Sequence, residues 1–234
     1  MAVPYTTVAQ ESVHVITEAW PPYVIKDENE QPSGILYDMA QEVFKSMDYT
    51  MTFKFYPWKR CKVYMQKQKA DGLLGVNKNE ELEQFMFYPE ESFMSYSTVF
   101  FYKKGNEFSY EGIESLTGKV VGTFLGYTYN VEFNNATTFQ KESVTTYEQN
   151  FKKLLAGRVD LIIGNKDVHL YVAKNMGILD QIGYSPNSLI VEEPNYMGFA
   201  QKEGSQELAQ KFSDALKAFK QTKRYIEIYN TYTQ

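Results

Sequence analysis

The residue best suited to gripping a charged ligand is Arg60, the only arginine among the first 150 residues. A guanidinium group presents a planar fork of N–H donors that matches the two oxygens of a carboxylate. Arg60 stands three residues after Pro57, near the start of a segment that we expect to be helical, and Trp58 beside it offers a flat wall. The pattern indicates a carboxylate-binding position. A solvated helix residue is the competing interpretation, and the sequence leaves both open.

A second segment suited to anions is Gly126-Tyr127-Thr128, which follows a predicted strand. We predict that a helix opens there. Exposed backbone N–H groups at a helix start, together with the Thr128 hydroxyl, would suit an anionic group. Glu18 lies close to Trp20, where a carboxylate would favour a cationic part of a ligand; the alternative is a solvated loop charge.

The sequence offers little for metal binding or catalysis. It contains one cysteine, Cys61, and two histidines, His14 and His169, which lie far apart. No HExxH or CxxC spacing occurs, so we expect no metal and no cofactor, and we expect Cys61 to be a packed thiol. Glu18 and Glu81 are candidates for general acid–base work, but no motif pairs them, and we predict a protein that is not an enzyme.

Composition bounds the class of partner. The 24 basic and 29 acidic residues give a net charge of −5, which argues against nucleic acid because counterion displacement needs clustered Lys and Arg. The 234 residues, 43% of them hydrophobic, suffice for two folded lobes of about 100 residues each. No segment approaches the ~20 apolar residues of a membrane span. No apolar signal-peptide core precedes Val13, so we expect an exported protein whose signal peptide has been removed.

The first part of the chain alternates strands and helices in the order β-α-β-α-β. The apolar spacing from Leu36 to Met47 marks one face of an amphipathic helix, and Pro57 suits the start of another. This order predicts a parallel sheet with helices on its faces. The predicted strands cover residues 13–16, 51–56 and 73–76.

The second stretch repeats this β-α-β logic, so we predict a second lobe. No linker rich in proline, glycine or serine divides independent domains, and we expect short extended segments to join the lobes as a hinge. The predicted strands cover residues 98–103, 119–123, 159–163 and 197–201, and the predicted helices cover 147–155, 167–176, 208–219 and 225–229.

Five motifs in this order resemble those of the family 3 extracellular solute-binding proteins, over nearly the whole chain. They are Trp20-Pro21-Pro22-Tyr23 followed by Gly34-Ile35-Leu36-Tyr37-Asp38, then Pro57-Trp58-Lys59-Arg60, Lys69-Ala70-Asp71-Gly72, Leu116-Thr117-Gly118-Lys119-Val120-Val121-Gly122 with Gly126, and Gly157-Arg158-Val159-Asp160.

The resemblance implies an α/β fold of two lobes, the type II periplasmic-binding-protein fold, with a mainly parallel sheet in each lobe and a two-segment hinge. Lobe 1 would comprise residues 1–101 and 198–234, and lobe 2 residues 102–197. It further implies a periplasmic monomer that captures a small polar solute, an amino acid or a related amine or organic acid, in the cleft between the lobes and delivers it to the membrane permease of an ABC transporter.

The resemblance also implies site residues. Trp20 matches the aromatic residue that stacks on the ligand, whereas the position of Tyr23 more often packs the loop. The segment containing Tyr127 and Thr128 matches the one that grips the ligand carboxylate. The predicted ligand-binding residues are Trp20, Tyr23, Trp58, Arg60, Asn77, Tyr127, Thr128 and Asn165, with Glu18 and Glu81 as further candidates.

Two positions depart from the family pattern. Glu81 stands where members that bind α-amino acids carry an arginine, and Asn165 stands where the family has an aspartate for the α-ammonium group. A carboxylate accepts hydrogen bonds only, so Glu81 cannot replace the bidentate arginine. Either Arg60 takes over the ligand carboxylate or the ligand is not an ordinary α-amino acid. Two other functions stay open: an enzyme on the same fold, such as a dehydratase-like relative, and the ligand-sensing domain of a membrane receptor.

Overall fold

The computed structural model describes residues 11–125, 127 and 129–233, and the chain divides into two compact units. Unit 1 comprises Met1–Met94 and Pro194–Gln234, and unit 2 comprises Ser95–Glu193. The chain therefore passes between the units twice. The first passage falls at the start of strand β7 (Met94–Lys103) and the second within strand β11 (Ile182–Ala200).

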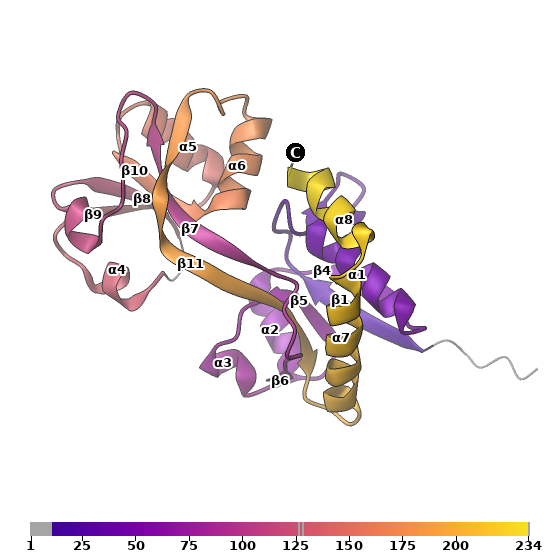
Figure 1. The fold of residues 1–234 in the computed structure, drawn as a ribbon. Coiled ribbons are helices and arrows are strands. Elements are labelled where there is room, and N and C mark those ends of the chain that lie inside the picture. Colours follow the sequence, from indigo (N-terminus) through magenta and orange to yellow (C-terminus); the bar gives the residue numbers. More distant parts are fainter. Residues whose placement is uncertain (1–10, 126, 128, 234) are drawn as a thin grey trace, which may run out of the picture. The chain divides into compact units, whose positions relative to one another are not determined.

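Unit 1 contains a mixed sheet in the order β4-β1-β5-β11 (Figure 1). Strand β1 is parallel to both β4 and β5, and β11 runs antiparallel to β5. The three parallel strands therefore end at the same edge of the sheet. They are β1 (Ser12–Thr17), β4 (Thr50–Phe55) and β5 (Gly72–Val76); β6 (Met86–Phe87) also pairs with β11, and β2 (Ile25–Lys26) pairs with β3 (Pro32–Ser33) in a separate ribbon.

Helices cover both faces of the unit 1 sheet. Helix α1 packs against α7 and α8 on one face, where the rings of Phe44 and Phe212 have centroids 4.9 Å apart (Figure 1). Helices α2 and α3 cover the other face through a core that includes Cys61, Met65 and Leu82. The helices are α1 (Ile35–Ser46), α2 (Trp58–Gln66), α3 (Glu80–Glu83), α7 (Ser205–Phe219) and α8 (Lys223–Thr233).

Unit 2 has its own sheet in the order β7-β10-β8-β9, in which β8 is parallel to β10 and β9, while β7 is antiparallel to β10. Phe101 and Ile162 belong to the core under α5 and α6, whereas Phe100 and Ile163 belong to the core under α4, so both faces are covered. The elements are β8 (Val120–Phe124), β9 (Gln140–Val144), β10 (Leu161–Asn165), the 3-10 helix η1 (Ile113–Leu116), α4 (Val131–Asn135), α5 (Tyr147–Leu155) and α6 (Lys166–Asn175).

The two units share a hydrogen-bonding device at the start of a parallel strand pair. The backbone N–H of Asp71 donates to His14 O (2.8 Å), and Asp71 Oδ2 accepts from the backbone N–H of His14 (2.6 Å). In unit 2, Asp160 exchanges the same two bonds with Val120, at 2.8 and 2.7 Å. The aspartates of two sequence motifs are thus structural, since each fixes where one parallel strand starts beside its neighbour.

The structure confirms the α/β class and most of the predicted elements. The predicted strands do not include β2, β3, β6 or β9, and the predicted start of β11 is too late. Strand β9 has the polar sequence QKESV and no alternation that would mark it. Strand β11 begins at Ile182 rather than at Met197. Its first part was not predicted because it contains prolines and glutamates, which are uncommon in strands. Among the described residues, no helix is long and apolar enough to cross a membrane, and no cluster of three potential metal ligands occurs.

Candidate functional site

Each unit presents loops at the carboxyl ends of its parallel strands, the place where ligands bind in open α/β sheets. In unit 1 these loops follow β1, β4 and β5. We call their predicted site residues the unit 1 face: Glu18, Trp20, Trp58, Arg60 and Asn77. In unit 2 the corresponding loops follow β8, β9 and β10. The unit 2 face consists of Phe124, Tyr127, Tyr147 and Asn165.

The Trp20 loop is held by a tight backbone turn. The N–H of Trp20 donates to Val24 O (2.7 Å), and the N–H groups of Tyr23 and Val24 donate to Trp20 O (2.9 and 3.0 Å). Gly34 closes the loop with φ +114°, and a Cβ there would lie 2.7 Å from Tyr23 O, so only glycine fits. Trp20 is therefore fixed in place, partly buried, at the end of β1.

Tyr23 does not lie at the surface. Its side chain is fully buried, and its ring lies 4.5 Å from that of Trp20, centroid to centroid. A buried ring in this position supports Trp20 from the core side. Glu18, in contrast, is exposed immediately after β1. The structure therefore gives Tyr23 the loop-packing role that the family pattern more often assigns to this position.

Trp58 and Arg60 both lie in the first turn of α2, which Pro57 precedes as the N-cap. Trp58 is partly buried against the core under α2, and Arg60 is exposed. The Arg60 guanidinium carbon lies 5.8 Å from the centroid of the Tyr56 ring, a cation–π distance. Within the described residues no carboxylate forms an ion pair with Arg60, and the contact with the Tyr56 ring restricts its rotamers.

The segment after β5 combines Asn77 with a cation that the sequence analysis missed. Tyr88 Oη donates to the carbonyl oxygen of Asn77 (3.0 Å), which fixes the loop. Lys78 Nζ lies 4.4 Å from the centroid of the Tyr196 ring and 5.8 Å from that of Tyr88. Lys78 can be identified only from its contacts with the Tyr196 and Tyr88 rings, because in the sequence it lies in a polar run without a distinguishing pattern.

Glu81 pairs with a lysine of a neighbouring helix. Its Oε1 lies 2.8 Å from Lys62 Nζ, and its side chain is 60% exposed. This position therefore links α3 to α2 at the surface.

In unit 2, Asn165 has a structural task that the sequence analysis did not assign. It is the N-cap of α6, and its Oδ1 accepts from the N–H of Val168 (3.0 Å). Asparagine is among the preferred N-cap residues, so this substitution of the family aspartate keeps the cap. Asn165 is 7% exposed at the carboxyl end of β10. The side-chain oxygen of Asn165 therefore already accepts one hydrogen bond within the protein.

The helix predicted to open at Gly126-Tyr127-Thr128 begins later. Helix α4 starts at Val131, and Asn130 caps it by accepting from the N–H of Phe133 (2.8 Å). Asparagine is among the preferred N-cap residues. Tyr127 lies before the helix and is 47% exposed, whereas Gly126 and Thr128 lie outside the described residues. Of the predicted segment only Tyr127 is described, and the helix that follows it starts at Val131.

Three aromatic rings meet at the end of β8. Phe124 and Tyr147 are stacked with centroids 4.7 Å apart and planes at 26°, and Tyr127 meets Phe124 edge-on at 5.0 Å. The hydroxyl oxygens of Tyr127 and Tyr147 lie 3.1 Å apart, a hydrogen bond between the two phenols. We call Phe124, Tyr127 and Tyr147 the aromatic cluster. Sequence analysis singled out only Tyr127, since Tyr147 fits the apolar stripe of α5.

A buried histidine backs the aromatic cluster. The His169 ring lies 5.1 Å from Tyr147 and is stacked on Phe101 at 5.0 Å. Its Nδ1 lies 2.8 Å from Asn165 O; because a carbonyl only accepts, Nδ1 carries the proton. Burial lowers the pKa of His169 to about 4, so the ring is neutral at physiological pH. A Cβ on Gly164 would overlap this ring, which explains the glycine there.

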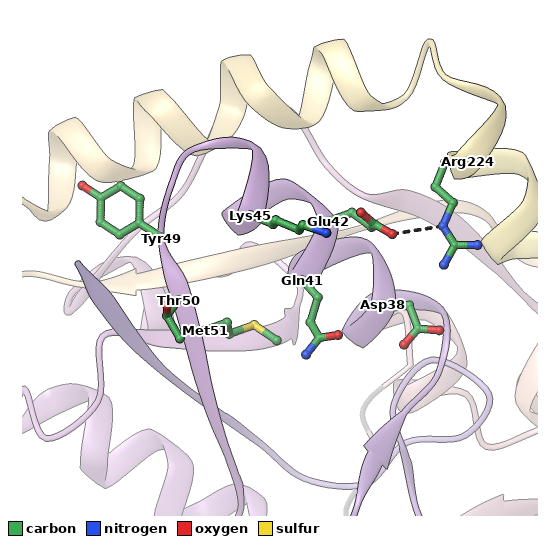
Figure 2. Close-up of a pocket in the computed structure, with 8 residues that line it drawn as sticks. All are labelled: Asp38, Gln41, Glu42, Lys45, Tyr49, Thr50, Met51 and Arg224. Carbon is green, nitrogen blue, oxygen red and sulfur yellow. Dashed lines mark hydrogen bonds and ion pairs between the residues drawn. The ribbon is translucent and has the colours of Figure 1, made fainter. Parts of the chain in front are cut away.

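A separate pocket of about 450 Å³ lies on the outside of unit 1, along α1 (Figure 2). Three of its lining charges have partners within the protein: Arg224 Nε lies 3.0 Å from Glu42 Oε1, and Tyr232 Oη donates to Asp38 Oδ2 (2.7 Å). Thr50 in its wall stands at the amino end of β4, the opposite end from the unit 1 face. The pocket lies where Arg224 of α8 pairs with Glu42 of α1.

The comparison with known families decides the classification. The family described as "Bacterial extracellular solute-binding proteins, family 3" matches residues 13–234. The chain belongs to this family. The predicted family is thereby confirmed, and the protein is a solute-binding protein in which two α/β units carry the strand-end loops described above.

Two curated relatives are similar over almost their full length. The "Arginine-binding periplasmic protein" of Mannheimia haemolytica is 26% identical over 230 residues, which cover 96% of this chain and 92% of the relative. The "Putative ABC transporter arginine-binding protein 2" of Escherichia coli is 27% identical over 236 residues, covering 97% and 92%. Both relatives are named as binding proteins rather than enzymes.

Solved structures show the same fold. The probable amino-acid ABC transporter extracellular-binding protein ytmK from Bacillus subtilis gives a TM-score of 0.81 at 19% identity, with 96% of this chain and 98% of that chain covered. An ancestral arginine-binding protein bound to arginine gives 0.75 at 24% identity, covering 95% and 98%. A histidine kinase sensor domain similar to periplasmic binding proteins also gives 0.75, at 17% identity, covering 95% and 96%. The predicted type II periplasmic-binding-protein fold is confirmed.

Proposed function

We propose that this solute-binding protein is the periplasmic receptor of an ABC-type uptake system and that its ligand is a small amino acid or a related amine or organic acid. The observation that carries the proposal is the chemistry of the strand-end loops. In both units they present aromatic rings beside polar groups: Trp20 and Trp58 with Arg60 in unit 1, and Tyr127 with Asn165 in unit 2. Flat rings with a few placed polar groups are typical of sites for small polar molecules.

In this proposal, residues of both units bind the ligand. The proposed lobes comprise residues 1–101 with 198–234 and residues 102–197, and the chain passages through β7 and β11 would act as the hinge. The binding residues are those predicted from the sequence: Trp20, Tyr23 (as support for Trp20), Trp58, Arg60, Asn77, Tyr127, Thr128 and Asn165, with Glu18 adjacent and Glu81 held by Lys62. The protein acts as a monomer and binds no nucleic acid.

The first ligand class to test is the cationic amino acids. Two relatives carry arginine in their names, and Glu18 adds a carboxylate to the unit 1 face. Arg60 would take the ligand carboxylate, because Glu81 cannot. Asn165 would accept a hydrogen bond from the α-ammonium group through its neutral amide oxygen. This contact would be weaker than the charged contact that an aspartate makes.

Thermal denaturation with a panel of polar metabolites tests the proposal. A ligand at 100 times its Kd stabilises the folded state by about 2.7 kcal/mol, which raises Tm by about 5–10 °C in a chain of this size. Arginine, lysine, glutamine, small amines and small organic acids form the panel. At least one should raise Tm and bind with one-to-one stoichiometry in calorimetry. If none does, the receptor function is wrong.

The protein is proposed to release its ligand unchanged. The carboxylate of Glu81 is 60% exposed and ion-paired with Lys62, and Glu18 is exposed, so neither is held in a buried site of the kind that positions a catalytic acid. Incubation of the protein with the bound solute, followed by NMR, should return the solute intact. Conversion of the solute would instead support the enzyme alternative.

A further inference from the structure

The charge of the chain is distributed unevenly along its sequence. Residues 49–70 contain five lysines and one arginine but no aspartate or glutamate, although the whole chain has a net charge of −5. The rest of the chain therefore holds the other 18 of the 24 basic residues together with all 29 acidic residues. The segment forms β4, α2 and the turn before β5, so its cations all belong to unit 1. They are Lys54, Lys59, Arg60, Lys62, Lys67 and Lys69.

Ring contacts join the cations of β4, α2 and the following turn into one surface. Tyr56 follows β4 and Tyr64 lies in α2, which covers one face of the unit 1 sheet, and the centroids of the two rings are 4.8 Å apart (Figure 1). Lys54 Nζ lies 5.5 Å from the centroid of Tyr56, and Lys69 Nζ lies 5.8 Å from that of Tyr64. Arg60 contacts the Tyr56 ring as well. We call the six cations and these two rings the basic patch.

Most cations of the basic patch have no acidic partner. Among the residues that the structure describes, the patch forms one ion pair, between Lys62 and Glu81. Elsewhere in unit 1, in contrast, an exposed lysine such as Lys211 pairs with Glu207. Four lysines of the patch are exposed and form no ion pair with a described residue: Lys54, Lys59, Lys67 and Lys69. The positive charge of this surface is thus largely unopposed.

The composition of the basic patch favours a diffuse anionic surface over a single acidic group. Arginine has the planar fork that binds one phosphate or carboxylate through two bonds, whereas lysine is a hydrated point charge on a flexible stem. The patch has five lysines for one arginine. Clusters of about four to eight basic residues are typical of surfaces that bind anionic lipids. Val63 of α2 is 42% exposed, and the lysine stems and tyrosine rings add apolar parts that suit the headgroup region.

We propose that the basic patch binds the anionic phospholipid headgroups of a membrane surface. The acidic remainder of the chain is repelled by the same surface, so the charge asymmetry orients unit 1 with α2 toward the membrane. The attraction acts within about 10 Å at moderate salt, because dissolved ions screen it beyond that distance. This contact goes beyond the proposed function and does not depend on which solute the protein carries.

Sedimentation of the protein with lipid vesicles tests the proposal. The wild type should bind vesicles that contain about 30% phosphatidylglycerol and not vesicles of phosphatidylcholine alone, and high salt should abolish the binding. The triple variant Lys54→Ala, Lys67→Ala, Lys69→Ala should bind at least tenfold more weakly, since each lysine near the surface contributes about fivefold to the partition coefficient.

A second triple variant is the matched control. Lys104→Ala, Lys152→Ala, Lys217→Ala removes three exposed lysines outside the basic patch, so it changes the net charge equally and should bind vesicles like the wild type. Exposed lysines contribute little to folding, and circular dichroism will verify that both variants are folded. Calorimetry with a solute should give the same affinity for the wild type and for both variants.

Three results would overturn the proposal. The first is a wild type that does not bind the phosphatidylglycerol vesicles, and the second is an equal loss of vesicle binding in both triple variants. The third is patch-dependent binding of polyglutamate or of a single-stranded oligonucleotide that is tighter than binding to the vesicles, which would indicate an acidic protein or a nucleic acid as the partner. None of these results affects the receptor function, which the solute panel tests separately.

Discussion

Asp71 and Asp160 occupy the same structural position in the two units. Each exchanges two hydrogen bonds with the backbone of a neighbouring parallel strand, Asp71 with His14 and Asp160 with Val120. Asp71 also forms an ion pair with Lys202. Because the strands that begin at these bonds end in the loops of the unit 1 and unit 2 faces, the two aspartates set the register on which both faces depend.

Replacing either aspartate with alanine should destabilise its own unit. The backbone N–H of His14 or Val120 would lose a charged acceptor, which costs about 1.5–3 kcal/mol at the partly buried Asp71 and less at the exposed Asp160, where water can replace the carboxylate. We expect a lower unfolding midpoint in urea for Asp71→Ala and for Asp160→Ala, whereas the exposed Asp180→Ala should match the wild type. Equal midpoints for all four proteins would show that the shared device adds no stability.

Arg60 should contribute to binding through its planar fork. Arg60→Ala removes a bidentate, charge-assisted contact with the ligand carboxylate and should weaken binding about 10- to 100-fold, measured by calorimetry. Arg60→Lys keeps the charge without the planar fork, so its affinity for the ligand should lie between those of the wild type and Arg60→Ala. Lys59→Ala, an exposed neighbour, is the control. Unchanged affinity in Arg60→Ala would make it a solvated helix residue.

His169 should make unit 2 sensitive to acid. Its pKa is lowered by burial to about 4, below the ordinary value of 6.5, so the unfolded state binds the proton more readily. The stability that this provides is complete above pH 6.5 and is lost as the pH falls toward 4, up to about 3 kcal/mol. The free energy of unfolding, measured with urea, should differ less between pH 7 and pH 5 in His169→Phe than in the wild type. The same pH dependence in both would contradict this assignment.

Asn165→Asp should tighten binding of ligands that carry an α-ammonium group. Aspartate caps a helix as well as asparagine does, so α6 should keep its start, and the added charge should strengthen the contact about tenfold. Arginine and 5-guanidinovaleric acid, which lacks the α-ammonium group, can be compared by calorimetry, and only arginine should bind more tightly. Asn130→Asp, at the N-cap of α4, keeps its own cap and should not alter affinity. A result in which neither variant changes affinity would remove Asn165 from the site.

Local patterns were sufficient to predict the secondary structure wherever apolar residues repeat with a clear period. Helix α1 and strand β5 lie within a residue or two of their predicted bounds, because Leu36, Val43 and their neighbours face one core. Strand β9 could not be predicted, since its polar residues join the sheet through pairing with β8 alone. The segment is a strand because it pairs with β8, and such pairing cannot be read from the residues of one strand alone.

The candidate site was predictable only in part, for a related reason. Trp20 and Arg60 stand out by residue type next to prolines, which are local signals. Tyr147 fits the apolar stripe of its helix, and its role in the aromatic cluster depends on the distance to Phe124, which is remote in sequence. Asn165 carries two roles, helix cap and candidate ligand contact, and the sequence analysis considered only the second.

Calorimetric titration of the wild type, Trp20→Leu and Tyr127→Leu with the same solute tests most directly whether residues of both units are needed for binding. We predict one-to-one binding by the wild type and at least a tenfold loss of affinity in each variant, although the two residues belong to different units. Binding that neither substitution weakens, or that only one of them affects, would contradict the proposed set of binding residues.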